Sequence, residues 1–250
     1  MRIFLAVLVG IVMIAGTARA QTDEIQVYTA EVVDPGTFGL TWHNNYIADG
    51  RKVADNPGGI VPHHVYNGVP ELAYGVTDWF EVGTYLPVYS VTGGKLVLDS
   101  IKLRALFVVP HAAERDFFYG VNFELSRNWN RWDPNRMSGE IRPIIGTRFG
   151  PVDVVLNPIL DTNFDGLGHL DFAPSLRVAY NVSPTFAVAL EHYADFGELR
   201  GFSPADQQDH SLFGVVDFTA GKADIEFGVG HGFTPAGDKL VMKLMLAFGF

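Results

Sequence analysis

The sequence contains no cysteine and no long apolar run, and it holds far fewer basic than acidic residues. Without cysteine there is no disulfide framework and no thiol chemistry. The longest apolar stretch, residues 3–14, is shorter than the roughly 20 residues that a membrane-spanning helix needs. With 18 basic residues against 28 acidic ones, the chain lacks the basic surface typical of nucleic-acid binding, so we predict no nucleic-acid partner.

The first twenty residues are typical of a secretory signal. Met1-Arg2 is a short basic start, residues 3–14 are apolar, and Ala18-Arg19-Ala20 is a small-x-small cleavage site. We expect cleavage before Gln21. The predicted organisation is a signal peptide over residues 1–20, a lead-in segment over 21–35 and one β-barrel domain over 36–250.

The last eleven residues alternate strictly between two rows. One row is wholly apolar and ends on Phe248 and Phe250, whereas the other carries smaller side chains and the charge of Lys243. This pattern is typical of a strand with one face toward lipid and the other toward a lumen. It predicts the closing strand of a barrel in the outer membrane of a Gram-negative bacterium. The expected partners are outer-membrane lipid and lipopolysaccharide, and the barrel-assembly machinery acting through Phe250.

Similar alternating segments recur along the chain, with Gly, Pro, Asn or Asp between them. Because only helices and closed barrels satisfy every backbone group in a bilayer, the pattern predicts an all-β fold. We expect a transmembrane antiparallel up-and-down β-barrel of about twelve strands, with ten or fourteen left open. The expected strands cover residues 36–47, 69–77, 79–90, 97–109, 116–127, 139–149, 151–160, 170–180, 185–195, 210–219, 222–231 and 240–250.

The connections predict the orientation of the barrel. Tight turns follow the second, sixth, eighth and tenth expected strands, and a short link follows the fourth. The odd-numbered strands are followed by longer polar links. Bacterial barrels have short periplasmic turns and longer outer loops, so we expect both termini on the periplasmic side. The longer links cover residues 48–68, 91–96, 128–138, 161–169, 196–209 and 231–239.

The second row of each expected strand carries charges of both signs. Opposite charges on neighbouring strands should pair, because an isolated charge in a lumen is very costly. Two interpretations remain open: the charges cross-link a closed interior, or they line a selective water path. The expected pairs are Arg104–Glu124, Arg142 with Glu124 or Asp153, Arg177–Glu191 and Lys243–Glu226. The candidate selectivity residues are Lys102, Arg104, Glu124, Arg142, Arg177 and Glu191.

The sequence predicts no catalytic residue, no metal site and no cofactor. Most of the eight histidines fall in expected loops, without metal-ligand spacing. Residues 161–166 match the first half of a calcium loop, but its twelfth position is Phe172 instead of Glu. His210 and Ser211 would face opposite sides of one strand, so they cannot form a catalytic dyad. We therefore expect a protein that is not an enzyme.

The lead-in segment ahead of the first strand leaves three placements open. Residues 25–28 alternate weakly and are followed by Pro35-Gly36. The segment could lie inside the lumen, add a periplasmic strand or stay loose. We expect a short ordered lead-in.

Three stretches carry a family resemblance. Residues 33–46 run VDPGTFGLTWHNNY, residues 57–59 are Pro-Gly-Gly, and residues 71–83 run ELAYGVTDWFEVG. Together they resemble the phenol-degradation-pathway (MetA-pathway) group of proteobacterial outer-membrane barrels, over about the first third of the chain. The resemblance implies an outer-membrane barrel that transports hydrophobic compounds, and it identifies no ligand-contacting residue.

These observations predict a passive channel or transporter for small molecules, hydrophobic or aromatic solutes among them, that works without a cofactor. The alternative is a closed structural or surface-interaction barrel whose outer loops bind a partner, a metal or lipopolysaccharide. An open or sealed lumen would separate the two.

Overall fold

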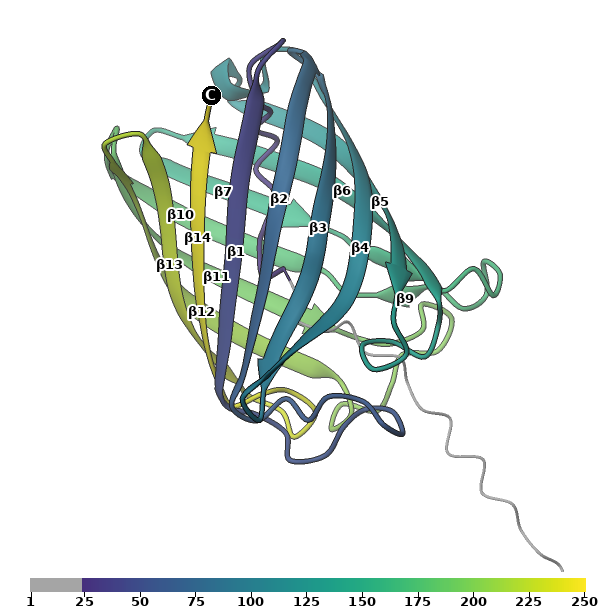
Figure 1. The fold of residues 1–250 in the computed structure, drawn as a ribbon. Helices are drawn as coiled ribbons and strands as arrows, with labels where there is room; N and C mark the ends of the chain where they lie inside the picture. The colour runs from purple at the N-terminus through teal and green to yellow at the C-terminus, as the bar shows by residue number, and fades with distance from the viewer. Residues whose placement is uncertain (1–23) are drawn as a thin grey trace, which may run out of the picture.

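The computed structural model describes residues 24–250 and forms a closed antiparallel β-barrel (Figure 1). The expected signal peptide, residues 1–20, lies outside the described residues. β7 and β8 together form the seventh transmembrane strand, and β9 and β10 the eighth, so the barrel has twelve. The strands are β1 (Phe38–Asp49), β2 (Val65–Thr77), β3 (Phe80–Thr92), β4 (Lys95–Val108), β5 (Phe117–Asn128), β6 (Met137–Phe149), β7 (Val152–Asn157), β8 (Leu160–Thr162), β9 (Asp171–Phe172), β10 (Ser175–Ser183), β11 (Phe186–Asp195), β12 (Asp209–Ala220), β13 (Ala223–Gly232) and β14 (Leu240–Gly249).

Two strand pairings close the sheet. β1 pairs with β14 in an unbroken register from Gly39–Gly249 to Ile47–Val241. On the far side β5 pairs with β6. Closure leaves no free strand edge, which is the condition for a sheet to lie in hydrocarbon. Within residues 24–250 no helix is long and apolar enough to cross a membrane.

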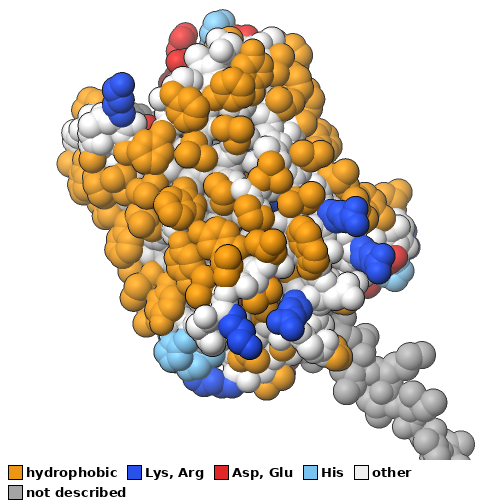
Figure 2. Space-filling view, viewed as in Figure 1, with side chains coloured by type: hydrophobic (Ala, Val, Ile, Leu, Met, Phe, Trp, Pro, Cys, Tyr) orange, Lys and Arg blue, Asp and Glu red, His pale blue; other side chains and the backbone are white. Residues whose placement is uncertain are grey.

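Apolar side chains cover the outside of the barrel. Leu72, Leu103, Phe123 and Leu190 are 42%, 61%, 43% and 56% exposed, values that would be unfavourable for so many large apolar residues facing water. Figure 2 shows hydrophobic side chains over the whole visible face of the barrel, with most of the visible basic side chains toward the end that carries the longer loops. This apolar band is the surface expected to face lipid.

The two ends of the barrel differ. The turn end carries residues 78–79, 150–151, 184–185 and 221–222, together with the start of β1 and the end of β14. The loop end carries residues 50–64, 129–136, 163–170, 196–208 and 233–239. The links follow the arrangement predicted from the sequence, with one exception on each end. The prediction that both termini lie at the turn end is correct for the C-terminus, but residues 24–26 lie toward the loop end, because residues 24–34 run back through the barrel.

The exceptions involve the connections on either side of β4. The β3–β4 link, expected to be long, is the two-residue turn Gly93-Gly94, with φ of 55° and 71°. Two positive φ angles allow a tight hairpin turn that matches strand twist. The β4–β5 link, expected to be short, spans residues 109–116 and contains the 3₁₀-helix η1 (Ala112–Glu114). In the β3–β4 link, the two glycines with positive φ allow a shorter connection than the polar sequence of the link indicates.

The seventh and eighth transmembrane strands were predicted to be continuous, and they are broken. Pro158 separates β7 from β8, and Pro174 separates β9 from β10. Proline lacks the N–H that a central strand needs for its ladder. The Ala173 N–H donates to the Ile159 carbonyl at 3.1 Å and keeps the wall closed at this level. β2 also begins at Val65, four residues earlier than expected.

Three cross-strand pairs place a glycine opposite a large aromatic ring, and two of these pairs lie inside the barrel. At Gly230 an added Cβ would lie 2.4 Å from ring atoms of Phe213, which is 2% exposed. The aromatic ring of the neighbouring strand therefore occupies the space that a side chain would take, which is a known way to stabilise glycines in strands. The pairs are Gly68–Tyr89, Gly146–Phe118 and Gly230–Phe213.

We expect Gly230→Ala to destabilise the barrel by about 1–3 kcal/mol, because the new methyl group overpacks Phe213. Urea unfolding in detergent measures the change. Gly214→Ala on β12 is the matched control, since nothing lies within 4 Å of its added Cβ. Equal stability of the two variants would contradict the packing argument.

Candidate functional site: a plugged lumen with an acidic cavity

Residues 24–34, here called the plug segment, run through the inside of the barrel (Figure 1). Ile25, Val27, Tyr28 and Ala30 are each 5% exposed or less. Val27, Tyr28 and Ala30 pack against Phe118, Ile144 and Val155 of the wall, among others. Of the three placements that the sequence left open for this segment, the structure shows the first: the segment lies inside the lumen.

Tyr28 and Asn157 form the central attachment. The Tyr28 N–H donates to Asn157 Oδ1 at 2.7 Å, and Asn157 Nδ2 donates to the Tyr28 carbonyl at 3.1 Å. One wall amide thus satisfies both backbone groups of a plug residue, as a neighbouring strand would. The Tyr28 hydroxyl lies 2.6 Å from that of Tyr85, and the Arg142 guanidinium lies 4.4 Å from the Tyr28 ring centroid. Asn157 is fully buried.

Charged side chains hold the rest of the plug backbone. Lys243 Nζ donates to the Ile25 carbonyl and Arg142 Nη1 to the Gln26 carbonyl, each at 3.2 Å. The Val33 N–H donates to a Glu81 carboxylate oxygen at 2.5 Å. Hydrogen bonds to charged groups are stronger than neutral ones. The plug segment is therefore fastened at both ends as well as in the middle.

A glycine on β2 makes room for the plug near the turn end. An added Cβ at Gly75 would lie 2.2 Å from the Val33 carbonyl oxygen. The Gly36 N–H donates to the Gly75 carbonyl at 2.8 Å. No other residue would let the plug backbone approach the wall this closely.

One group of wall charges lies on β1 to β4. Arg104 forms ion pairs with Glu71 and Glu81, and its Nε donates to Glu71 at 2.5 Å. His43 Nε2 lies 2.9 Å from Glu71 Oε2. Arg104 is aligned with Glu124 in the β4–β5 register, as predicted. Its guanidinium nevertheless lies on the carboxylates of β2 and β3, because its long side chain reaches across two strands.

A second group lies on β10 to β14. Arg177 forms ion pairs with Glu191, Asp217 and Glu226, and Lys243 forms them with Glu191 and Glu226. The predicted pairs Arg177–Glu191 and Lys243–Glu226 are both present. Lys243 and Glu191 are almost fully buried. Two buried cations shared among three carboxylates cross-link five strands and avoid an uncompensated charge.

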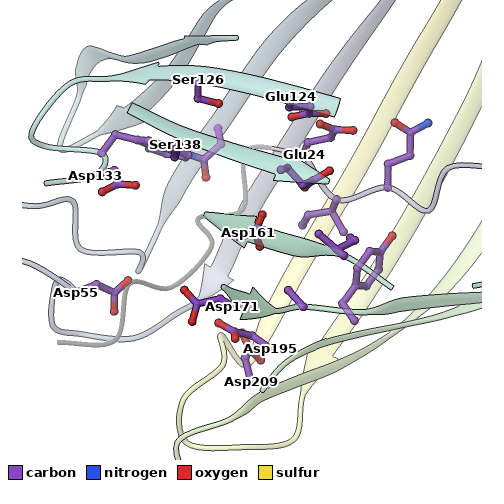
Figure 3. A pocket seen from close by; sticks show the side chains of 18 of the residues that line it. Glu24, Asp55, Glu124, Ser126, Asp133, Ser138, Asp161, Asp171, Asp195 and Asp209 are labelled. Atoms are coloured by element: carbon purple, nitrogen blue, oxygen red, sulfur yellow. The ribbon is translucent and has the colours of Figure 1, made fainter. Parts of the chain in front are cut away.

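Between the plug segment and the loop end, which is drawn at the bottom of Figure 1, the lumen widens into a cavity of about 260 Å³. Glu24, Ile25 and Gln26 of the plug line it together with wall and loop residues. Figure 3 shows carboxylates around this space, contributed by the plug, by several strands and by the loop end. Ten acidic residues line the cavity: Glu24, Asp55, Glu124, Asp133, Glu140, Asp161, Asp171, Asp195, Asp209 and Asp238.

Among residues 24–250, three basic residues line the same cavity: Arg51, Lys102 and Arg142. Arg51 is held by Asp55 and Asp238, Lys102 lies 3.7 Å from Glu124, and Arg142 lies between Glu140 and Glu24. Each cation is thus already neutralised by a carboxylate. The cavity carries an excess of negative charge, which attracts cations and repels anions.

The six residues singled out from the sequence divide between two levels of the lumen. Lys102, Glu124 and Arg142 line the acidic cavity. Arg104, Arg177 and Glu191 belong to the two groups of wall charges described above. Arg142 was expected to pair with Glu124 or Asp153, and instead forms its ion pairs with Glu140 and Glu24. The prediction missed the plug residue because Glu24 lies more than one hundred positions away in sequence.

Sequence reasoning also missed most of the acidic cavity. Asp161, Asp195 and Asp209 lie at the loop ends of β8, β11 and β12, next to links that were predicted only as polar loops. The available signal was their spacing: Asp195 continues the odd-numbered inward row of Glu191 and Tyr193. Following the alternation of inward and outward side chains to the last residue of the strand would have identified Asp195 as a lumen residue.

The motifs weighed for metal binding and catalysis form neither kind of site in residues 24–250. No group of three or more His, Asp or Glu is placed to hold a metal ion. In the stretch that resembles a calcium loop, the Phe164 N–H donates to the Thr162 hydroxyl at 3.0 Å, which is an ordinary turn. His210 contacts His192 and Gln208, whereas Ser211 lines the cavity.

Two loops are joined by a histidine at the loop end. His169 Nδ1 lies 3.0 Å from Glu198 Oε1. The hydrogen bond and the negative charge of Glu198 raise the pKa of His169 above its usual value. The protonated form is favoured, so this link is strongest at low pH and weakens as the pH rises through the raised pKa.

No family model and no curated protein matches the sequence, so the resemblance to the phenol-degradation-pathway group stays a prediction. Solved barrels do match the structure. The KdgM porin in complex with disordered oligogalacturonate matches over 85% of this chain and 99% of its own, with a TM-score of 0.54 and 9% identity. The NanC porin matches over 84% and 98%, with a TM-score of 0.55 and 7% identity.

A third match is the translocator domain of the autotransporter NalP from Neisseria meningitidis. It covers 87% of this chain and 90% of that domain, with a TM-score of 0.51 and 10% identity. At such low identities these similarities show a shared fold and nothing finer. The fold is that of outer-membrane β-barrels.

We expect Asn157→Ala to release the plug segment. The change leaves two buried backbone groups of Tyr28 unsatisfied, at about 1–3 kcal/mol each, and every 1.4 kcal/mol shifts the open population about tenfold. Single-channel recordings in planar bilayers should show more frequent or larger openings. Asn181→Ala, which removes an exposed hydrogen bond to Asp153, should behave like the unchanged protein. Identical traces for all three proteins would contradict this role of Asn157.

The His169–Glu198 contact predicts a pH effect confined to the loop end. In an NMR titration in detergent, His169 should titrate above the usual histidine range, and Glu198→Gln should lower its pKa. A His169 pKa that does not respond to Glu198→Gln would show that the two side chains do not interact in solution.

Proposed function

We propose that this chain is a passive outer-membrane channel for small molecules, closed by its own plug segment and selective for cations. The loop end faces outward and the turn end faces the periplasm, as in other bacterial barrels. The observation that carries the proposal is the acidic cavity, which opens at the loop end and ends below on residues 24–26 of the plug. The shared fold with two porins supports it.

The plug segment has the properties of a removable gate. Residues 24–34 belong to no strand ladder of the wall, and the first bridge to the wall, between Pro35 and Gly75, comes directly after them. The plug segment is held by a few hydrogen bonds and by four buried apolar side chains, so displacing it leaves the twelve-stranded wall intact. Since burial of an apolar side chain contributes about 1.5–3 kcal/mol, the closed state should dominate and openings should be brief.

The electrostatics of the cavity set the class of solute. KdgM was solved with oligogalacturonate, an acidic oligosaccharide. The ten carboxylates lining the cavity here would repel such an anion. We therefore propose small cationic or neutral polar solutes. The hydrophobic solutes implied by the phenol-degradation resemblance are the alternative, and apolar lining residues such as Trp132 and Phe213 favour it.

A second candidate function is a closed structural or surface-interaction barrel. The observation in its favour is the interior itself, where the plug and two groups of paired charges fill the lumen below the cavity. A barrel of this kind would conduct no ions under any condition and would bind its partner through the loop end.

Ion selectivity tests the channel proposal. In a KCl gradient the reversal potential of the Asn157→Ala protein should show a preference for K⁺ over Cl⁻. The change Asp161→Asn/Asp171→Asn/Asp195→Asn should reduce that preference several-fold at 0.1 M salt, and 1 M salt should mask it, because the screening length falls from about 10 Å to about 3 Å.

The control removes three acids at the turn end instead, with Asp78→Asn/Glu114→Gln/Asp116→Asn, and should keep the selectivity. A protein that is folded but never conducts, or a preference for Cl⁻, would refute the proposal. The first result would support the closed barrel.

A further inference from the structure

A basic pocket lies on the outside of the barrel, where β4 and β5 reach the loop end. Its lining consists of Leu98, Arg127, Asn128, Trp129, Asn130, Arg131 and Arg136. The lining contains three arginines and no carboxylate, in a chain with ten more acidic than basic residues. Figure 2 shows most of the visible basic side chains toward the loop end.

Arg127 lies where the apolar surface ends. It continues the outward row of Phe123 and Leu125 on β5. Its register partners on the neighbouring strands are Ile101 and Met137, which are 37% and 41% exposed. The outward side chains that precede Arg127 on β5 are therefore those expected to face acyl chains, and the guanidinium of Arg127 is expected at the level of the lipid headgroups.

The three guanidinium groups have no partner in the part of the chain that the structure describes. Within residues 24–250 the side chains of Arg127, Arg131 and Arg136 make no hydrogen bond, ion pair or ring contact. Inside the lumen, Arg104, Arg142 and Arg177 are each paired with carboxylates. Three exposed cations within one pocket repel one another, so the pocket attracts an anion with several charges.

Trp129 and Leu98 complete the pocket with apolar surface. They are 43% and 49% exposed, and the Trp129 N–H donates to the Asp99 carbonyl at 2.8 Å, which fixes the loop start against β4. Tryptophan is enriched at the level where acyl chains meet headgroups. The pocket thus offers cations on the side toward the loop end and apolar surface on the side toward the middle of the membrane.

We propose that this pocket binds the phosphate groups of a lipid A-type glycolipid in the outer leaflet. The planar guanidinium groups bind phosphate oxygens in bidentate fashion, and the acyl chains pack on Leu98, Ile101 and Trp129. Basic pockets on membrane proteins bind anionic lipid headgroups in this way. The inference rests on the proposed outer-membrane placement with the loop end outward, and it does not require the channel to conduct.

Native mass spectrometry of the delipidated protein in detergent tests the proposal, with bis-phosphorylated lipid A added. The unchanged protein should retain at least one lipid A molecule. Arg127→Gln/Arg131→Gln/Arg136→Gln should reduce the bound fraction at least tenfold, and the corresponding triple change to lysine should recover part of it. Heat-dependent migration on SDS gels checks that each variant is a folded barrel.

Charge-matched and ligand-matched controls separate the sources of binding. Arg115→Gln/Arg200→Gln/Lys222→Gln removes three exposed cations elsewhere and should leave the bound fraction unchanged. Dephosphorylated lipid A should bind at least tenfold less, and inorganic phosphate should not compete at millimolar concentration. Equal binding by the triple glutamine variant, equal binding of dephosphorylated lipid A, or full competition by inorganic phosphate would each overturn the proposal.

Discussion

The pairing of β1 with β14 is the contact on which the structure depends. A bilayer offers no hydrogen bonds to a strand edge, so the sheet is stable there only when its first and last strands meet. Ten aligned residue pairs join these two strands. Closure also fixes which row of each strand faces inward, because side chains alternate with a period of two. The apolar band and the charged lumen follow from this closure, and the lumen that it creates is the space that the plug segment fills.

Closure creates an electrostatic problem that the plug segment helps to solve. The inward rows carry buried cations and carboxylates, and each must be paired or hydrated. Lys243 and Arg142 bind carboxylates on the wall and also donate to plug carbonyls. The same side chains thus hold the wall and the plug. In the proposed channel, release of the plug segment would expose these charged groups to water, where they are well solvated, so opening would not leave a buried charge without a partner.

Much of the barrel could be predicted from the sequence because its signals are local. Alternation of apolar residues fixed the strands, and turns such as Gly150-Pro151 marked their ends. The errors have local causes too: Gly93-Gly94 makes a hairpin where a loop was expected, and Pro158 and Pro174 interrupt strands. The plug was not predictable in this way, since Tyr28 and Asn157 are 129 positions apart. Nothing in either segment alone indicates that they meet.

The central claim is that residues 24–34 occupy the lumen, and the absence of cysteine allows a direct measurement. A single cysteine in place of Ala30, which is 3% exposed, should react with a membrane-impermeant maleimide far more slowly than one in place of Val53, which is 76% exposed. We predict a rate at least one hundred times lower in the folded barrel, with equal rates after unfolding. Comparable labelling of the two cysteines in the folded protein would show that the segment is not inside the barrel.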